Sequence, residues 1–372
     1  MSSHGCFVTI ISALLLSVGS SAIAVEPQDS AGYQVITSNR EYDSSSAAWG
    51  AGSGSDCACS DCASSDCGGC CDEDCYQRCC CPRWTATADI IFLDRIGSKS
   101  QTLVRETDRQ SPTDGVLLDS KDFDFGFRGG PRVSLIRHGD NCYDLEFLYF
   151  QIDGWRSSRR VDIDLPGEDG IEFSVPGHDV YSTFDPMKFD YDSKLYNAEL
   201  NVRWAQTCRI TMLAGFRWAK LRENFAGELE DTIDIPFWNT ETVNNLYGFQ
   251  IGADAKLWQC CRFSINGLLK AGIYANHAEQ TSWLQYDEYE GSASGSTDHT
   301  AFLGEIGLVG KYQVNDCLTL RIGYQLLWLD GVALPPNQIP VTYLDLEDSW
   351  AGVDAKNTVF YHGATAGFEY KF

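Results

Sequence analysis

Cysteine is the residue type with the most evident chemistry in this sequence. Ten cysteines fall within residues 57–81, and five more lie further along the chain. Such density predicts disulfides or a metal site, because thiols pair in oxidising compartments and thiolates also bind zinc. The spacings in "CAC", "CSDC" and "CGGC" could hold zinc, but the cluster lacks the two well-separated pairs of a zinc ribbon. We favour disulfides over bound metal or free thiols, and expect no metal and no other cofactor.

Histidine is the other candidate for chemistry. Five histidines follow the N-terminal segment: His138, His178, His277, His299 and His362. His277 and His299 bracket a stretch that contains "YDEYE", but no G-x-S-x-G nucleophile motif accompanies them. A surface histidine near acids is more often solvated than catalytic, so we predict that the protein is not an enzyme.

The charge balance excludes one large class of partner. The chain carries 52 Asp and Glu against 28 Lys and Arg, for a net charge of −24. Nucleic-acid binding needs a basic face, so we expect no nucleic-acid partner. Aromatic residues make up 12% of the chain, a composition that favours β-strands.

The N-terminus predicts export. An apolar run in "MSSHGCFVTIISALLLSVGSSAIAVEP" ends in Ala-Ile-Ala, which is typical of a cleaved signal peptide over residues 1–24, although no Lys or Arg precedes the run. The run is too short for a membrane anchor, and no later stretch could form a transmembrane helix. We expect residues 25–82 to be a flexible, Cys-rich periplasmic segment and residues 83–372 to form the folded domain.

From Trp84 onward, apolar and polar residues alternate. In "FDFGFRGGPRVSL", for example, Phe123, Phe125 and Phe127 share one face, while Asp124 and Arg128 share the other. This period of two indicates strands with one oily and one polar face. Ten segments alternate in this way: 84–94, 123–137, 142–155, 189–204, 209–221, 245–258, 262–276, 300–314, 318–330 and 358–372.

The connections between these segments alternate in length. Four are short, at 138–141, 205–208, 259–261 and 315–317. Five are long, at about 95–122, 156–188, 222–244, 277–299 and 331–357. Short periplasmic turns and long outer loops are typical of a transmembrane, antiparallel, up-and-down β-barrel. We predict about ten strands (eight to twelve), and keep a soluble sandwich or lipocalin-like barrel as the alternative.

The ends of the strands indicate which face meets lipid. Trp84 and Trp204 lie in the oily phase near the short turns, and Trp155, Trp218 and Trp328 near the long connections, as in the aromatic girdles of membrane barrels. The chain ends on "GFEYKF", where Phe368, Tyr370 and Phe372 share the oily face. We expect these rings to face outer-membrane lipid.

The polar faces would then line the lumen. Their acids and bases nearly balance, which predicts a narrow lumen crossed by ion pairs rather than a wide channel. The excess acid lies in the connections, so a pore with an acidic mouth would favour cations, unless the loops only keep the surface solvated. The predicted lining residues are Asp89, Asp124, Arg128, Arg132, Asp144, Glu146, Glu199, Arg203, Arg217, Asp254, Lys256, Lys270, Glu305, Lys311, Arg321, Glu369 and Lys371.

This topology gives the cysteines a common location. The five later cysteines all fall at short turns, on the same periplasmic side as the N-terminal cluster. We predict disulfides that tether the N-terminal segment beneath the barrel, with a link to another envelope protein as a further option because fifteen is an odd number. The candidates are Cys57, Cys59, Cys62, Cys67, Cys70, Cys71, Cys75, Cys79, Cys80, Cys81, Cys142, Cys208, Cys260, Cys261 and Cys317.

Three stretches carry a family resemblance. "NNLYGFQIGADAKLW" with "LKAGIYANHA", "LRIGYQLLWLDGVALPPNQI" and the closing "GFEYKF" together resemble the outer-membrane β-barrel porin family of planctomycete-type bacteria, mainly over residues 240–372. The resemblance implies an outer-membrane barrel, and its terminal Phe implies recognition by the barrel-assembly machinery. We therefore expect a narrow or gated porin for small cationic solutes. The alternative is a structural or adhesive surface barrel whose acidic loops bind a partner or divalent cations.

Overall fold

The computed structural model describes residues 83–97, 99–106, 115–139, 143–162, 171–175, 178–183, 186–207, 209–229, 237–286, 289–344 and 349–372. All of them belong to the second of two compact units, Ser55–Phe372. The predicted signal peptide and the N-terminal cysteine cluster lie outside the described residues. Within those residues, no helix is long and apolar enough to cross a membrane.

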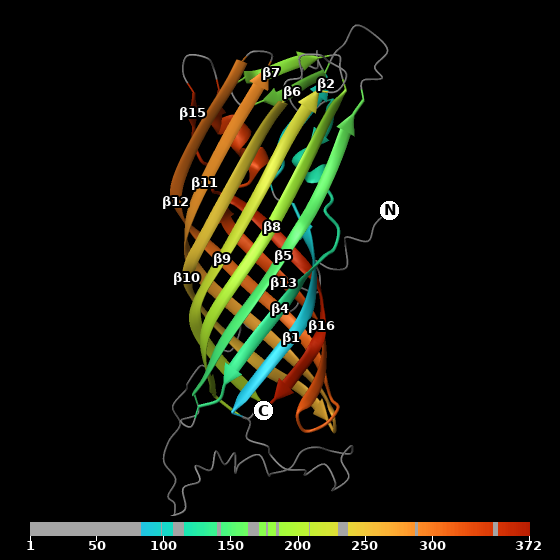
Figure 1. The fold of residues 1–372 in the computed structure, drawn as a ribbon, viewed down its shortest axis with the longest axis vertical. Coiled ribbons are helices and arrows are strands. Elements are labelled where there is room, and N and C mark those ends of the chain that lie inside the picture. Colours follow the sequence, from blue (N-terminus) through green and yellow to red (C-terminus); the bar gives the residue numbers. More distant parts are fainter. Residues whose placement is uncertain are drawn as a thin grey trace, which may run out of the picture. The chain divides into compact units, whose positions relative to one another are not determined.

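Ten antiparallel strands close into one barrel, as Figure 1 shows. Around the ring the order is β1, β16, β13, β12, β11, β10, β9, β8, β5, β4, so the first and last strands pair to close it. The predicted ten-stranded antiparallel architecture is therefore confirmed. The strands are β1 (Trp84–Ile96), β4 (Arg128–Arg137), β5 (Tyr143–Val161), β8 (Met187–Ala205), β9 (Ile210–Leu229), β10 (Phe237–Cys260), β11 (Phe263–Tyr286), β12 (Tyr289–Gln313), β13 (Leu318–Val332) and β16 (Asn357–Lys371).

The oily faces of these strands point outward. Phe249 is 76% exposed, Ile251 68%, Ile273 69% and Ile322 68%. A soluble protein rarely exposes large apolar side chains in such a continuous patch, whereas lipid-facing residues of a barrel must be apolar. The polar residues of the same strands turn inward. We call the band of exposed apolar residues the lipid belt.

The strands continue well beyond this belt. β10, β11 and β12 are 24, 24 and 25 residues long, whereas a transmembrane strand needs about 9–11 residues. The prediction of long loops at 222–244 and 277–299 is wrong, because most of those residues extend β9, β10, β11 and β12. Alternation weakens there, since the outward face changes from apolar to polar once the strand has left the lipid.

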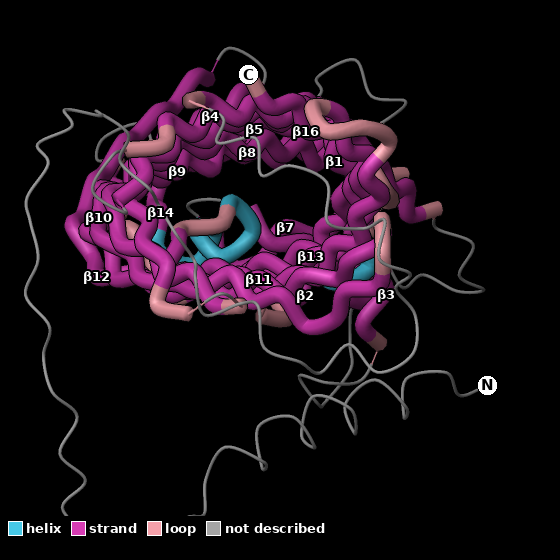
Figure 2. The backbone as a smooth tube through the Cα atoms, turned by 90° about the horizontal axis from the view of Figure 1, so that it is seen from below, coloured by secondary structure: helices cyan, strands magenta, loops and turns pink. Residues whose placement is uncertain are grey.

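Further elements lie at the end of the barrel opposite the chain's C-terminus (Figure 1). β2 (Thr102–Glu106), β3 (Val116–Asp119), β6 (Ile171–Val175) and β7 (His178–Thr183) form a four-stranded sheet in the order β3-β2-β6-β7, and the 3-10 helix η3 spans Ser120–Asp122. A second 3-10 helix, η4 (Pro335–Val341), precedes the two-stranded sheet of β14 (Thr342–Tyr343) and β15 (Trp350–Ala351). Figure 2 shows η4 inside the ring of strands.

At two glycines the backbone turns neighbouring side chains to the face opposite the one predicted. Gly126 and Gly154 adopt positive φ values of 59° and 86°, in the left-handed region that glycine enters without steric cost. Phe123 and Phe125 consequently lie in the core, and Trp155 turns inward at a bulge in β5, where it is fully buried. The predicted positions of Asp124 in the lumen and of Trp155 in the outer girdle are therefore wrong.

Candidate functional site

A network of buried ion pairs crosses the middle of the lumen. Arg217 on β9 lies 3.1 Å from Glu305 on β12 and 3.6 Å from Glu199 on β8. Lys270 on β11 lies 2.8 Å from Glu199 and 3.9 Å from Glu305. None of these four side chains is more than 2% exposed. Each buried charge is therefore paired, which is the condition for placing charge in a low-dielectric interior.

The network extends across the ring through β4. Arg132 lies 3.9 Å from Glu305 and donates a 2.5 Å hydrogen bond to Gln325 on β13. Because β4 is three strands from β13 and four from β12 around the ring of ten, these contacts cross the lumen. At this level the lumen is filled by side chains.

A second layer of ion pairs lies closer to the short turns. Arg203 contacts Glu146 at 2.9 Å and Asp254 at 3.4 Å. On the other wall, Lys311 lies 2.9 Å and Arg321 3.6 Å from Glu369. The two layers surround a cavity of about 90 Å³. A cavity of this size and polarity has room for several water molecules but is too small to serve as a wide channel.

On the side of the ion pairs that faces away from the short turns, the lumen is filled mainly by apolar side chains. Phe123, Tyr191, Phe225 and Trp238 pack edge to face, with ring centroids 5.2–5.7 Å apart. They belong to one buried cluster that also includes side chains from β1, β5, β13 and β16. This upper half of the barrel therefore has a packed core like that of a soluble protein, which the sequence analysis did not foresee.

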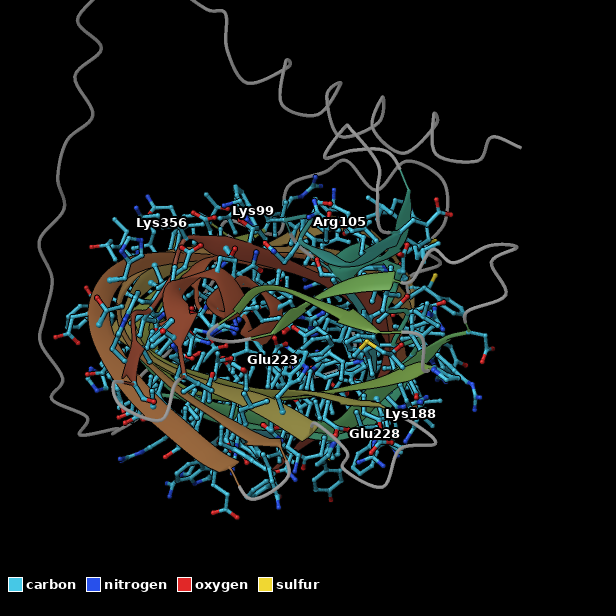
Figure 3. All side chains as sticks on the ribbon, turned by 90° about the horizontal axis from the view of Figure 1, so that it is seen from above. Lys99, Arg105, Lys188, Glu223, Glu228 and Lys356 are labelled. Atoms are coloured by element: carbon cyan, nitrogen blue, oxygen red, sulfur yellow. The ribbon has the colours of Figure 1, made fainter. Side chains whose placement is uncertain are left out.

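One ion pair is buried within that core. Arg95 on β1 binds Glu223 on β9 through two hydrogen bonds of 2.8 and 3.0 Å, and neither side chain is more than 2% exposed. Tyr191 and Ser193 also donate to Glu223, at 2.6 and 2.7 Å, and Figure 3 shows Glu223 inside the ring. The sequence analysis missed this pair because both residues lie where we expected connections to begin.

Residues 333–344, which we call the inner segment, fold back into the barrel. Asn244 on β10 donates to the carbonyl of Ala333 at 2.8 Å and accepts from its amide at 2.7 Å. Asn276 on β11 donates to the carbonyl of Gly331, and Gln280 donates to Thr342. Pro335 to Ile339 are buried. The inner segment thus covers the lumen from above, and it includes the "ALPPNQI" part of the resemblance motif.

The structure places most of the predicted lining residues on the lumen side. Those in the two ion-pair layers are Asp89, Arg132, Glu146, Glu199, Arg203, Arg217, Asp254, Lys270, Glu305, Lys311, Arg321 and Glu369. Asp144 lies at the short-turn end and contacts His138 at 2.9 Å, and Lys371 lies 3.9 Å from Glu369.

Three predicted positions differ from this pattern. Asp124 and Arg128 are exposed near the bulge of β5, and Arg128 donates to the carbonyl of Gly154 at 3.0 Å. Lys256 is exposed beside a register shift between Lys256 and Trp258. Within the described residues neither Arg128 nor Lys256 belongs to the ion-pair network: Arg128 lies beside the bulge of β5, and Lys256 opposes the lumen-lining Asn266 but is exposed near the short-turn end of β10.

Three cysteines lie among the described residues. Cys260 and Cys261 lie at the turn between β10 and β11, and Cys317 lies at the turn between β12 and β13. All three are therefore at the short-turn end, as expected. The remaining candidate cysteines, including Cys142 and Cys208, lie outside the described residues. Among the residues that the structure describes, no group of three or more potential ligands could hold a metal ion.

His277 lies on the outer face of β11, four residues beyond the exposed belt residue Ile273. Its ring is 2.7 Å from Asp298 and 3.4 Å from Glu279. The hydrogen bond with Asp298 raises the pKa of His277, and the charges of Asp298 and Glu279 add to this effect. These contacts therefore stabilise the fold at low pH, and the contribution is lost as the pH rises through the raised pKa of the folded state.

We accordingly expect the NMR signal of His277 to titrate above the ordinary histidine pKa of about 6.5. Asp298→Asn should return the pKa toward that value, and Glu279→Gln should lower it less. A pKa at or below the ordinary value in the unmodified protein would contradict the pairing.

Comparisons with known proteins add a family. The model of the family Putative beta barrel porin-7 (BBP7) matches residues 186–372. The search of curated proteins found no match. Similar solved structures include the outer membrane protease OmpT from Escherichia coli, with 9% identity, 80% of this chain and 100% of that chain covered, and a TM-score of 0.47.

Two further solved structures are similar to this chain at comparable sequence identity and coverage. The translocator domain of the autotransporter NalP from Neisseria meningitidis has 9% identity, covers 80% of this chain and 91% of its own, and has a TM-score of 0.35. The toluene transporter TodX from Pseudomonas putida has 10% identity, with 78% and 90% covered and a TM-score of 0.28. We draw no functional inference from these low scores.

Proposed function

The chain belongs to the Putative beta barrel porin-7 (BBP7) family, and from this premise we propose that it is a gated porin for small cationic solutes. It is an outer-membrane β-barrel. The proposal adds that the conformation described above is the closed one, and that the inner segment is the gate.

The observation that carries this proposal is the way in which the inner segment is held. Its polar contacts to the wall are hydrogen bonds from the side chains of Asn244 and Gln280, and Asn276 holds Gly331 just before it, so no ladder of strand pairing attaches it to the wall. The ten strands pair with one another independently of it. The inner segment can therefore leave the lumen while the barrel itself stays closed, at the cost of these hydrogen bonds and of exposing Leu334, Ile339 and Leu344, which pack in the buried cluster.

The ion-pair layers beneath the gate would act as a filter. A solute that passes between Arg217, Glu199 and Lys270 must exchange hydrogen bonds with side chains of both signs, which admits only small solutes. The protein's net charge of −24 lies mainly outside this balanced layer. An acidic surface raises the local concentration of cations, so we propose cation selectivity.

Planar-bilayer recordings test the gate. The double variant Asn244→Ala/Asn276→Ala removes three hydrogen bonds to the backbone of residues 331–333. At a net value of about 1 kcal/mol each, we expect an increase in open probability of at least about tenfold. Asn245→Ala is the matched control, because Asn245 lies on the same strand and faces outward. Equal open probability in both variants, or a preference for anions, would contradict the proposal.

One observation favours a second function. Within the described residues the lumen is blocked at two levels, by the inner segment and by the ion pairs of Arg217. A barrel that never opens would serve as a structural or adhesive surface protein, with its acidic connections binding a partner or divalent cations. In that case no variant conducts, and calorimetric titration with Ca²⁺ detects binding that is lost when the acidic connections are replaced by neutral ones.

The chain ends are part of the proposal. Phe368, Tyr370 and Phe372 are 48%, 46% and 58% exposed on the outer face, where we propose that the assembly machinery reads them. We further propose that a signal peptide exports the chain, and that cysteines at the short turns bond to the N-terminal segment or to an envelope protein. We propose no catalytic role.

A further inference from the structure

A groove of about 770 Å³ opens on the outer wall of the barrel. It lies beside the bulge of β5, where Gly154 interrupts the regular pairing with β8. Four cationic residues from four strands line it: Arg128 on β4, Arg156 on β5, Lys194 on β8 and Arg222 on β9. None of its lining residues belongs to the inner segment, and Glu223 is the one lining residue whose side chain is buried in the core.

Three of the four acids of the groove pair with an arginine, and the fourth, Asp153, accepts a hydrogen bond from the neutral hydroxyl of Tyr196. Asp192 pairs with Arg156 at 2.7 Å, Glu241 pairs with Arg222 at 2.7 Å, and Asp153 accepts a 2.7 Å hydrogen bond from Tyr196. The remaining acid, Glu223, is bound to Arg95 in the core.

Three cations at or beside the groove lack such a partner. Arg128 donates only to the backbone carbonyls of Phe127 and Gly154. Lys194 in the groove and Lys220 beside it on β9 make no ion pair with any residue that the structure describes. In a chain with a net charge of −24, three such cations against one carboxylate without a cationic partner, Asp153, indicate a site for an anion.

The position of the groove relative to the aromatic residues of the outer wall indicates which kind of anion it would bind. Outward-facing aromatic rings occur on four neighbouring strands. Tyr149 on β5, Trp218 on β9 and Tyr247 on β10 lie at one register level, and Tyr196 on β8 lies two residues beyond it, opposite Lys220. Register pairs connect this level, since Ala198 opposes both Tyr149 and Trp218, and Trp218 opposes Tyr247. Aromatic belts lie at the level of lipid headgroups.

The two lysines lie at the edge of this belt nearer the long connections, and Lys220 opposes Tyr196. Lys194 is two residues beyond Tyr196, and Lys220 is two residues beyond Trp218, each on the same face of its strand. A lipid whose acyl chains rest on the lipid belt would therefore present its headgroup to these cations. We propose that the groove binds the phosphate of a phosphorylated lipid in the leaflet nearer the long connections.

Lipid retention measured by native mass spectrometry tests this site on the full-length mature protein. The probe is diphosphoryl lipid A in mixed micelles, compared with the same lipid after removal of both phosphates. Lys194→Gln/Lys220→Gln removes two cations that have no partner, so the fold should be retained. Since each basic residue near an anionic lipid surface contributes about fivefold in affinity, binding should weaken about 25-fold.

The matched control is Lys99→Gln/Lys356→Gln, which makes the same change in net charge. Both lysines are exposed, and Figure 3 shows them on the side of the ring opposite Lys188, which lies on β8 with Lys194. The control should bind as the unmodified protein does. Equal binding by the two double variants, or equal binding of dephosphorylated lipid, would overturn the proposal. Displacement of lipid A by low millimolar inorganic phosphate would also overturn it, because it would identify a site for free phosphate.

Discussion

Arg217→Ala should lower the free energy of unfolding by about 3–5 kcal/mol, the cost of removing one partner from a buried ion pair. Arg217 is fully buried. Its guanidinium forms ion pairs with Glu199 and Glu305 and donates a hydrogen bond to Asn197. Without it, only Lys270 would pair with Glu199, and Glu305 would keep Lys270 and Arg132, each 3.9 Å away. Because the guanidinium of Arg217 is fully buried, the penalty should be near the upper end of mutational effects.

Urea titration of the protein in lipid vesicles, followed by tryptophan fluorescence, measures this effect. Arg222→Ala is the matched control on the same strand, because its side chain is 53% exposed and pairs with Glu241 on the outer face. Exposed pairs contribute less than about 1 kcal/mol. If the two variants lost stability equally, the lumen around Arg217 would have to be water-filled, which would argue for a permanently open pore.

Local alternation was enough to predict which side chains of a regular strand share a face, because side chains alternate between faces without reference to the rest of the chain. The connection lengths and the tryptophan positions were also needed to predict a membrane barrel and to assign Glu199, Lys270 and Glu305 to its inner face. The terminal rings of Phe368 and Phe372 could be assigned to the outer face for the same reason.

The assignment failed where the backbone is irregular or where contacts are distant. Positive φ at Gly126 and Gly154 reverses the facing of Phe125 and Trp155, and no count of alternating residues can anticipate that reversal. The inner segment depends on Asn244, which is 89 positions away from Ala333. Its apolar, proline-rich sequence resembles an ordinary connection until the amide groups that hold it are placed in space.

Gly363→Ala should prevent much of the chain from reaching the closed barrel. A methyl group at this position would lie 1.9 Å from the carbonyl oxygen of Phe92 and 2.9 Å from its carbonyl carbon, both of which belong to the backbone of β1. A rigid backbone cannot yield as a flexible side chain can, so the strands must separate. We expect a cost of about 3 kcal/mol, the upper end of typical overpacking effects.

The position of Gly363 makes this separation unusually damaging. It lies on β16 opposite Leu93 of β1, at the seam that joins the last strand to the first. Unpaired backbone groups at an open seam in lipid cost several kcal/mol each, so a local gap would prevent closure instead of being tolerated. Gly307→Ala is the matched control, because that glycine also faces the lumen and its added methyl would meet only ordinary contacts, the nearest at 3.6 Å. On unheated SDS gels the control should migrate as the compact folded form, whereas Gly363→Ala should migrate largely as unfolded chain. Normal folding of Gly363→Ala would mean that β1 and β16 pair less closely than described, and that the barrel is closed at this seam by other contacts.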